Sequence, residues 1–177
     1  MRVAVTGTPG TGKTTATTIL GERLETGPEP NLEVVHLNDV LEREGLYTAV
    51  DAERESKVAD LEALSAWLED RDDVVIDSHL AHLVDAERVA VLRCRPDDLE
   101  RRLRERGESE AKATENAESE ALDVILAEAV EEHGLESVYE IDTTDSAPEA
   151  VADDLEAVIA GEREPSAGDV DFVGYLA

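Results

Sequence analysis

Short apolar runs alternate along this chain with longer stretches whose apolar residues recur at helical spacing. The apolar runs predict five strands, at residues 3–6, 33–36, 74–76, 89–92 and 137–141. Buried parallel strands form continuous apolar runs, and the helices that connect them show a 3.6-residue period. The alternation therefore indicates an α/β fold with a parallel sheet.

Six helices are expected between and after these strands. They run from the glycine-rich segment near residue 10 to about residue 25, then over 38–43, 57–69, 97–106, 113–133 and 148–160. Asn38 is a candidate N-terminal cap, and Gly45 and Gly107 are candidate stops. Pro96 opens the fourth helix, because proline fits the first helical turn. The segment 161–177 carries several apolar residues, so we expect it to dock on the domain, although its role stays open.

The segment Gly7-Thr8-Pro9-Gly10-Thr11-Gly12-Lys13-Thr14 fits the phosphate-loop pattern G-x-x-x-x-G-K-[ST] and lies between a predicted strand and a predicted helix. Its glycines allow a backbone curl that points N–H groups at phosphate oxygens, beside the positive end of the helix dipole. Lys13 can reach the β- and γ-phosphates, and the Thr14 hydroxyl can ligate Mg²⁺. The pattern predicts a nucleoside-triphosphate site; a glycine-rich turn without a ligand is the remaining alternative.

A second candidate group, Asp77-Ser78-His79, directly follows an apolar strand. In phosphate-loop proteins a carboxylate at such a strand end helps to hold Mg²⁺, usually through water. Asp77 could instead simply cap the turn that follows. His79 could orient water or a phosphate, or it could serve only in packing. The other three histidines have no comparable context, and we assign them no role.

Arginines are concentrated in residues 101–106 of an otherwise acidic chain, with Arg93 and Arg95 just upstream. Guanidinium groups clamp phosphates and stabilise the charge on a transferring phosphoryl group. Some of these arginines are expected to pair with nearby glutamates along the helix instead. At least one should contact phosphate, because Lys13 alone cannot neutralise a transferring phosphoryl group.

With 177 residues, 41% of them apolar, the chain is long enough for one domain with its own core. Its formal charge of −28 is extreme, and only three of its 16 basic residues are lysines. Carboxylates spread over the sequence repel one another in dilute buffer, whereas molar salt shortens the Debye length to about 3 Å. We therefore expect a halophilic protein from a salt-rich cytoplasm; an acidic protein of a low-salt organism is the alternative.

No apolar run approaches the roughly 20 residues of a membrane span, and no secretory signal is recognisable. Cys94 is the only cysteine, which excludes an intrachain disulfide and a cysteine-based zinc site. These features favour a reducing, cytoplasmic location. Because the chain has no basic patch, direct nucleic-acid binding is unexpected.

The guanine-reading motif N/T-K-x-D of GTPases is missing, and a small phosphate-loop chain with a late arginine helix points to a nucleotide or metabolite kinase. Four segments make the chain resemble the adenylate kinase isoenzyme 6 family, also described as archaeal or nuclear ATP-binding kinase-like proteins. They are the phosphate loop extended to Thr15, Asn38-Asp39-Val40 with Leu46-Tyr47 and Asp51, the D-x-H motif Asp77-Ser78-His79, and residues 102–112 with Glu115-Asn116. The match covers about residues 1–160.

The resemblance implies a phosphate-loop NTPase fold with five parallel strands and flanking helices, in a single domain over residues 1–177. It implies a short monophosphate-binding segment near 36–59 and a small lid near 105–115. The activity it implies is Mg²⁺-dependent, reversible phosphoryl transfer from ATP to AMP, often with tolerance of other monophosphates, together with a separate ATPase activity. It also implies a role in late maturation of the small ribosomal subunit, through a small-subunit ribosomal protein.

By position in the motifs, the resemblance assigns the phosphates of ATP to Gly10, Gly12, Lys13, Thr14 and Thr15, with Arg106 as the lid arginine. The residues expected to be catalytic are Lys13, Asp77, His79 and Arg106. Mg²⁺ is expected at Thr14 and, through water, at Asp77. The candidate monophosphate-binding residues are Asn38, Asp39, Asp51 and Arg54.

The chain departs from the family pattern in two segments. In the lid, Glu108 stands where an aromatic residue is usual, and Ala111 where a second lysine is often found. In the monophosphate segment, Val50 and Arg54 stand where aromatic residues are common. The preferred acceptor, the lid contacts and the oligomeric state therefore stay open. Two other functions also stay open: an ATPase that acts mainly as a ribosome assembly factor, and a small-metabolite kinase, against which the D-x-H and lid matches argue.

Overall fold

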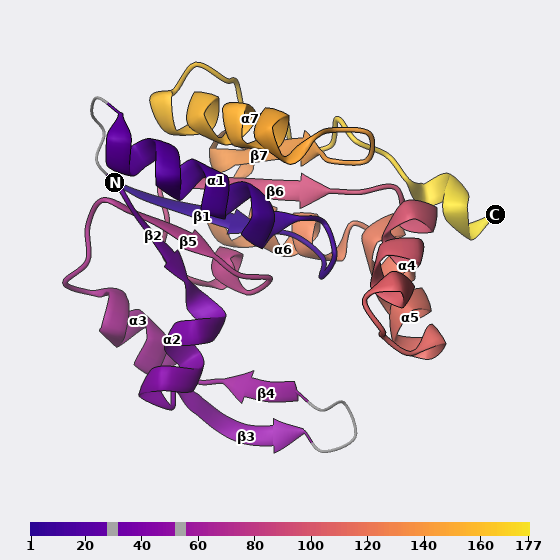
Figure 1. The fold of residues 1–177 in the computed structure, drawn as a ribbon, viewed down its shortest axis with the longest axis horizontal. Coiled ribbons are helices and arrows are strands. Elements are labelled where there is room, and N and C mark those ends of the chain that lie inside the picture. The colour runs from indigo at the N-terminus through magenta and orange to yellow at the C-terminus, as the bar shows by residue number, and fades with distance from the viewer. Residues whose placement is uncertain (28–31, 52–55) are drawn as a thin grey trace.

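Five parallel strands form the central sheet, shown in Figure 1 as a computed structural model that describes residues 1–27, 32–51 and 56–177, with the backbone alone at 49–51, 56 and 57. The strands are β1 (Arg2–Thr6), β2 (Glu33–His36), β5 (Val74–Asp77), β6 (Arg88–Arg93) and β7 (Val138–Asp142), in the spatial order β2-β5-β1-β6-β7. All five predicted strands are confirmed, each to within one residue at either end. Parallel pairing brings their carboxyl ends to one edge of the sheet, where ligands bind in open α/β folds.

Helices cover both faces of this sheet. They are α1 (Lys13–Thr26) and α7 (Pro148–Ala160) on one face, and α2 (Leu37–Glu44), α3 (Leu61–Leu68) and α6 (Val124–His133) on the other. In Figure 1, α1 and α7 lie side by side above the sheet. Successive strand residues face opposite sides, so Val3 and Val5 pack in the cluster of α1 and α7, whereas Ala4 packs in the other cluster. The core thus consists of two apolar layers that hold the sheet between them.

Beyond the carboxyl end of β6, α4 (Pro96–Glu105) and α5 (Glu110–Ala121) pack against each other (Figure 1). The prediction of one continuous helix over 113–133 is wrong. Asp123 adopts a left-handed φ of 55° and separates α5 from α6. Aspartate tolerates this conformation better than most residues, so the break fits its sequence position. The expected lid range 105–115 comprises the last residue of α4, a tight turn and the first six residues of α5.

The expected monophosphate segment contains a hairpin that the hydrophobic pattern did not indicate. Here β3 (Tyr47–Asp51) and β4 (Ser56–Ala59) form a separate antiparallel sheet of two strands. The predicted helix 57–69 is therefore shorter, and α3 begins after Asp60, whose side chain accepts a hydrogen bond from the Ala63 N–H at 3.0 Å. Asn38 is not the predicted cap, because α2 already begins at Leu37; the Asn38 side chain instead accepts a hydrogen bond from the Ser78 hydroxyl at 3.3 Å.

The first residue of β1 is tied to the end of α3. Arg2 donates from Nε to the Arg71 carbonyl at 2.9 Å and from Nη2 to the Leu68 carbonyl at 2.7 Å. The last carbonyls of a helix have no intrahelical partner and carry the negative end of its dipole, so a guanidinium group is favoured there. The C-terminal end of α3 is thereby held at the amino edge of the sheet.

The C-terminal segment contacts the domain through polar groups, whereas Val173 and Leu176, two of the apolar residues expected to dock it, are exposed. Buried Glu140 of β7 accepts hydrogen bonds from the N–H groups of Gly168 at 2.7 Å and Asp169 at 2.8 Å. Further along, the Tyr175 hydroxyl donates to Glu100 of α4 at 3.2 Å. Among the described residues, no helix is both long enough and apolar enough to cross a membrane.

Candidate active site

The glycines of residues 7–12 shape the loop between β1 and α1. Gly7, Gly10 and Gly12 have φ angles of 141°, 95° and 92°, which side-chain-bearing residues rarely adopt. A Cβ on Gly7 would lie 2.4 Å from the Leu92 carbonyl oxygen of β6, and one on Gly10 would lie 2.9 Å from Leu99 of α4. The loop therefore needs glycine both for its curvature and for its close approach to neighbouring elements.

Lys13, the first residue of α1, is buried beneath this loop. Its Nζ donates to the carbonyl oxygens of Gly7 at 2.7 Å and Thr8 at 3.0 Å. Burial lowers the pKa of Lys13 to about 8, although the negative charge of Asp77 acts in the opposite direction. An ammonium group that rests only on neutral carbonyls can move to an anionic ligand, because charge-assisted hydrogen bonds are the stronger ones.

Asp77 lies where the sheet register places the ends of β1, β5 and β2 together. It aligns with Val5 of β1 and with His36 of β2. The side chain is buried, and its Oδ2 accepts a hydrogen bond from the Thr17 hydroxyl at 3.1 Å. The Nδ1 of His36 lies 2.8 Å from the same oxygen. Both contacts fix the carboxylate at the base of the loop.

His36 is a site residue that sequence reasoning missed. Its position at the end of an apolar strand was the available signal, the same signal that identified Asp77. The distance of 41 residues between the two gave no indication of contact. Only the strand order, in which β2 pairs with β5, brings them together.

His79 follows two residues after β5, with its side chain open to the cavity in front of the loop. Desolvation by the surrounding protein and the charge of Lys13 lower the pKa of His79 to about 4. The imidazole is therefore neutral near pH 7, and it can donate one hydrogen bond and accept another. A neutral ring suits the orientation of water or phosphate, whereas it cannot neutralise charge.

A cavity of about 300 Å³ brings most of the predicted catalytic and monophosphate-binding residues together. Its lining includes Gly10, Lys13, Thr14, Asp77 and His79 from the loop side, with Arg106 from the end of α4 and Asn38 and Asp39 from α2. Two predicted residues are not placed: Arg54 lies outside the described residues, and of Asp51 only the backbone is described, at the end of β3.

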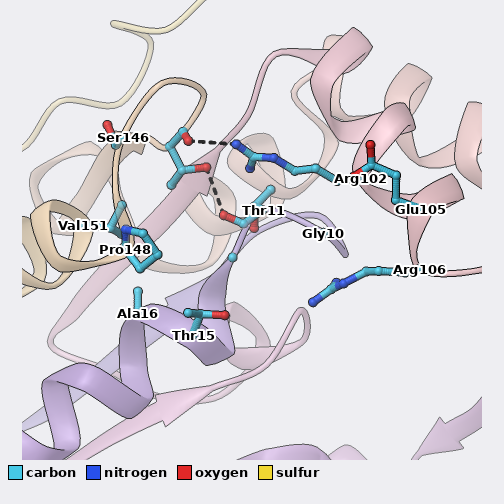
Figure 2. A pocket seen from close by; sticks show the side chains of 12 residues that line it. Gly10, Thr11, Thr15, Ala16, Arg102, Glu105, Arg106, Ser146, Pro148 and Val151 are labelled. Atoms are coloured by element: carbon cyan, nitrogen blue, oxygen red, sulfur yellow. Dashed lines mark hydrogen bonds between the residues drawn. The ribbon is translucent and has the colours of Figure 1, made fainter.

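A second cavity, of about 390 Å³, also borders the loop (Figure 2). Gly10, Gly12, Thr15 and Arg106 line it together with Thr143 and Ser146 of the segment between β7 and α7, called here the segment after β7, and with Pro148 and Val151 of α7. Figure 2 shows the Arg106 side chain extending from α4 towards the loop. Gly10 and Arg106 line both cavities, so Arg106 stands where the two meet.

The segment after β7 is a second part of the site that sequence reasoning missed. The Thr143 hydroxyl donates to the Thr11 carbonyl of the phosphate loop at 2.9 Å. Arg102 of α4 donates from Nη2 to the carbonyls of Thr143 at 3.2 Å and Thr144 at 3.0 Å. The general rule that ligands bind at strand carboxyl ends was the available signal for this segment.

The arginines divide between the two expected roles. Arg104 pairs with Glu100 at 2.7 Å and with Glu110 at 2.9 Å, which is the ion-pair alternative. Arg106 and Arg102 line the cavity of Figure 2, where a phosphorylated ligand could be clamped. Arg93, upstream of the helix, is buried behind the loop and pairs with Glu120 and two further carboxylates, so it is not among the residues that line either cavity.

The residues present fit Mg²⁺ in the mode of phosphate-loop proteins. That mode needs one hydroxyl and one carboxylate, with phosphate and water supplying the other oxygens. Thr14 and Asp77 line the same cavity and can supply these two groups. Within the described residues there is no cluster of three or more His, Cys, Asp or Glu that could hold a metal without a ligand's help.

Comparison with known proteins agrees with this geometry. The sequence profile of the AAA domain family matches residues 3–123. A Natronomonas pharaonis protein named "Putative adenylate kinase" is 62% identical, over 99% of this chain and 100% of its own. A Halobacterium salinarum protein of the same name is 56% identical, again over 99% and 100%. Both organisms are halophilic.

A solved structure of shikimate kinase from Bacteroides thetaiotaomicron matches with a TM-score of 0.57 at 17% identity, over 91% of this chain and 98% of that one. At this identity the likeness concerns the fold alone, and the fold is that of the phosphate-loop kinases. The chain therefore belongs to the AAA domain family, and within it to the group of proteins named "Putative adenylate kinase".

Proposed function

We propose that the protein is a Mg²⁺-dependent nucleoside monophosphate kinase that transfers the terminal phosphate of ATP reversibly to AMP, with tolerance of other monophosphates. One observation carries the proposal: two cavities border the phosphate loop and share Gly10 and Arg106. A kinase needs such an arrangement, because two substrates must meet at one transferring group. The names of the relatives point to the same reaction.

ATP is the expected occupant of the loop and of the larger cavity. Its phosphates would accept hydrogen bonds from the loop N–H groups and from Lys13, Thr14 and Thr15. Its nucleoside end would lie in the cavity of Figure 2, between Arg102 and the segment after β7. Arg102 is held there by two backbone carbonyls, so its planar guanidinium group can stack on a base.

The monophosphate is the expected occupant of the smaller cavity. Asp39 would repel a phosphate, but its carboxylate can accept hydrogen bonds from ribose hydroxyl groups or an amino group. The Asn38 amide can donate to a phosphate or to a base. Asp51 and Arg54 of the monophosphate segment remain candidates for the same substrate. We therefore expect the nucleoside of the acceptor to lie towards α2 and its phosphate towards Lys13 and Arg106.

In the transfer step, an oxygen of the acceptor phosphate attacks the γ-phosphorus in line. The bond from that phosphorus to the β–γ bridging oxygen breaks, and ADP leaves with the electron pair. Lys13 and Arg106 would stabilise the charge on the transferring group, and neutral His79 would orient a phosphate or water. Mg²⁺ held by Thr14 and, through water, by Asp77 would add positive charge beside the β- and γ-oxygens. Closure of the turn that carries Arg106 would exclude water and limit hydrolysis.

The finer parts of the resemblance are also proposals. Membership of the isoenzyme 6 type, an ATPase activity and a role in small-subunit maturation rest on the D-x-H and lid motifs. An acidic surface would aid encounter with a basic ribosomal protein, although molar salt would weaken that steering. A small-metabolite kinase remains the third possibility, since shikimate kinase shares the fold.

The test is to measure ADP and free phosphate formed from Mg-ATP in ~2 M KCl, where surface charge is screened. The reaction is run alone and with AMP, CMP, UMP or GMP. ADP formation that depends on a monophosphate, without free phosphate, supports the kinase. Phosphate release that ignores every monophosphate would contradict it and favour the ATPase. A pull-down at native salt, with ATP or ADP, would then test for a ribosomal partner.

A further inference from the structure

Glu120 of α5 is a buried carboxylate with no part in the transfer step. Only 3% of its surface is exposed, although it lies 112 residues from the phosphate loop in sequence. Its Oε2 accepts a hydrogen bond from the Thr8 hydroxyl at 2.5 Å. Its Oε1 accepts from Arg93 Nε at 2.8 Å and from the Cys94 N–H at 3.1 Å. A carboxylate this deep is costly unless it is paired, so these contacts need an explanation.

Thr8, the residue that Glu120 holds, is the hydrogen-bonding centre of the loop. Its carbonyl oxygen accepts from the Thr11 N–H at 3.3 Å and from the Thr11 hydroxyl at 3.0 Å. The same oxygen accepts from Lys13 Nζ at 3.0 Å. Thr8 therefore connects the Glu120 carboxylate of α5, the turn of the loop at Thr11 and the ammonium group of Lys13.

Arg93 fixes Glu120 from behind. Its guanidinium group is only 1% exposed and donates to Glu120, Glu140 and Asp123. Glu140 is held in turn by N–H groups of the C-terminal segment, and the Phe172 ring lies 5.5 Å from the guanidinium carbon. With its partners held on three sides, Glu120 has little freedom to turn away from Thr8.

We propose that Glu120 is a positioning residue that holds the phosphate loop, through Thr8, in the conformation that receives the triphosphate. The proposal rests on the proposed function, because it assumes that ATP binds at this loop. Loop N–H groups that already point inward bind phosphate without a cost of ordering, and small misplacements of such groups are expensive. Because the contact is on the donor side, its loss should affect ATP and leave the monophosphate unaffected.

The competing explanation is that Glu120 only balances the buried charge of Arg93. The two explanations separate at Thr8, because removing its hydroxyl leaves every contact of Arg93 intact. Thr8→Val removes the hydroxyl and keeps the shape of the side chain, whereas Thr8→Ser keeps the hydroxyl. Glu120→Gln is a second variant, which removes the charge and keeps most of the volume. Asp123→Asn is the control, because it removes a charge from Arg93 without touching the loop.

The experiment measures, in ~2 M KCl, the Kd of Mg-ATP by calorimetry without acceptor, the KM of ATP and of AMP, kcat and the Tm. We expect Thr8→Val and Glu120→Gln to weaken ATP binding by about tenfold or more, with the KM of AMP unchanged. Thr8→Ser and Asp123→Asn should bind ATP nearly as the wild type does.

Unchanged ATP affinity in folded Thr8→Val would overturn the inference, as would equal losses for ATP and AMP. If Glu120→Gln fails to fold, the comparison of Thr8→Val with Thr8→Ser still tests whether the Thr8–Glu120 contact supports ATP binding. If the wild-type protein does not bind Mg-ATP at all, the proposed function fails, and that outcome is recognised before any variant is made.

Discussion

Around the phosphate loop, several polar groups are bonded to distant parts of the chain, whereas in the monophosphate segment the described strands of the hairpin pair with each other. Thr8 contacts α5, Thr11 contacts the segment after β7, and Asp77 contacts both α1 and β2. In the part of the chain that the structure describes, β3 and β4 form a sheet of their own, and isolated two-stranded hairpins are only marginally stable. We infer that the side proposed to bind ATP, the donor side, is preorganised, and that the side proposed to bind the monophosphate, the acceptor side, adjusts to its substrate.

The largest expected effect is on the donor side, at Lys13. In Lys13→Met the charge at the transferring phosphate is lost, so kcat should fall by about 10²–10³-fold. Arg23→Met, at the other end of α1, is the matched control and should keep the wild-type rate, because Arg23 contacts two carboxylates and the Glu149 carbonyl on α7, away from both cavities. Steady-state kinetics measures both. Near-normal turnover in Lys13→Met would rule out this site.

A smaller loss of activity is expected at His36, which lines the smaller cavity between the phosphate loop and α2. His36→Phe removes the contact with Asp77, so kcat should fall by about tenfold and half-saturation should need more Mg²⁺, as is usual when the partner of a metal-binding carboxylate is lost. His36→Gln can still donate to Asp77 and should recover part of the rate. The measurement is a Mg²⁺ titration of the initial rate. Identical titrations for His36→Phe and the wild type would show that the contact between His36 of β2 and Asp77 does not contribute to Mg²⁺ binding.

A change on the acceptor wall should act on one substrate only. Asp39→Ala removes an exposed hydrogen-bond acceptor from the smaller cavity, so the KM of AMP should rise about fivefold, a value in the range of one partly solvated hydrogen bond. The KM of ATP should not change. Glu44→Ala, on the same helix but outside the cavity lining, is the control. A rise in the KM of ATP instead would show that the two walls are not independent.

Salt should raise the thermal stability of the whole domain. Carboxylates are spread over the whole chain, so raising KCl from ~0.1 M to ~2 M should raise Tm by several degrees through screening. A variant with the exposed carboxylates of α7 changed to amides should show a smaller rise. Thermal melts followed by circular dichroism measure both. A Tm that does not rise in the wild type would contradict the expectation of adaptation to salt.

The sequence was informative where local pattern decides the structure. The five strands and the phosphate loop were predictable because apolar runs and the glycine spacing are local signals. The hairpin was not, because the apolar residues of β3 and β4 neither form a continuous run nor alternate strictly, and part of β4 was assigned to the helix predicted from residue 57. The break at Asp123 was hidden because its neighbours on both sides continue the helical pattern. His36 and Glu120 were missed because their site partners, Asp77 and Thr8, lie far away in sequence and are brought near only by strand order and helix packing.

The attachment of Arg2 to the end of α3 has a mechanical consequence. α3 is fixed at one end, at the amino edge of the sheet, and its other end leads directly into β4. If α3 rotates about this attachment, the end that is not attached moves the furthest. Any rotation of α3 would therefore leave Leu68 almost in place and sweep the β3–β4 hairpin through the widest arc (Figure 1). A single arginine on the first strand would thus serve as the pivot for the segment that we propose receives the acceptor.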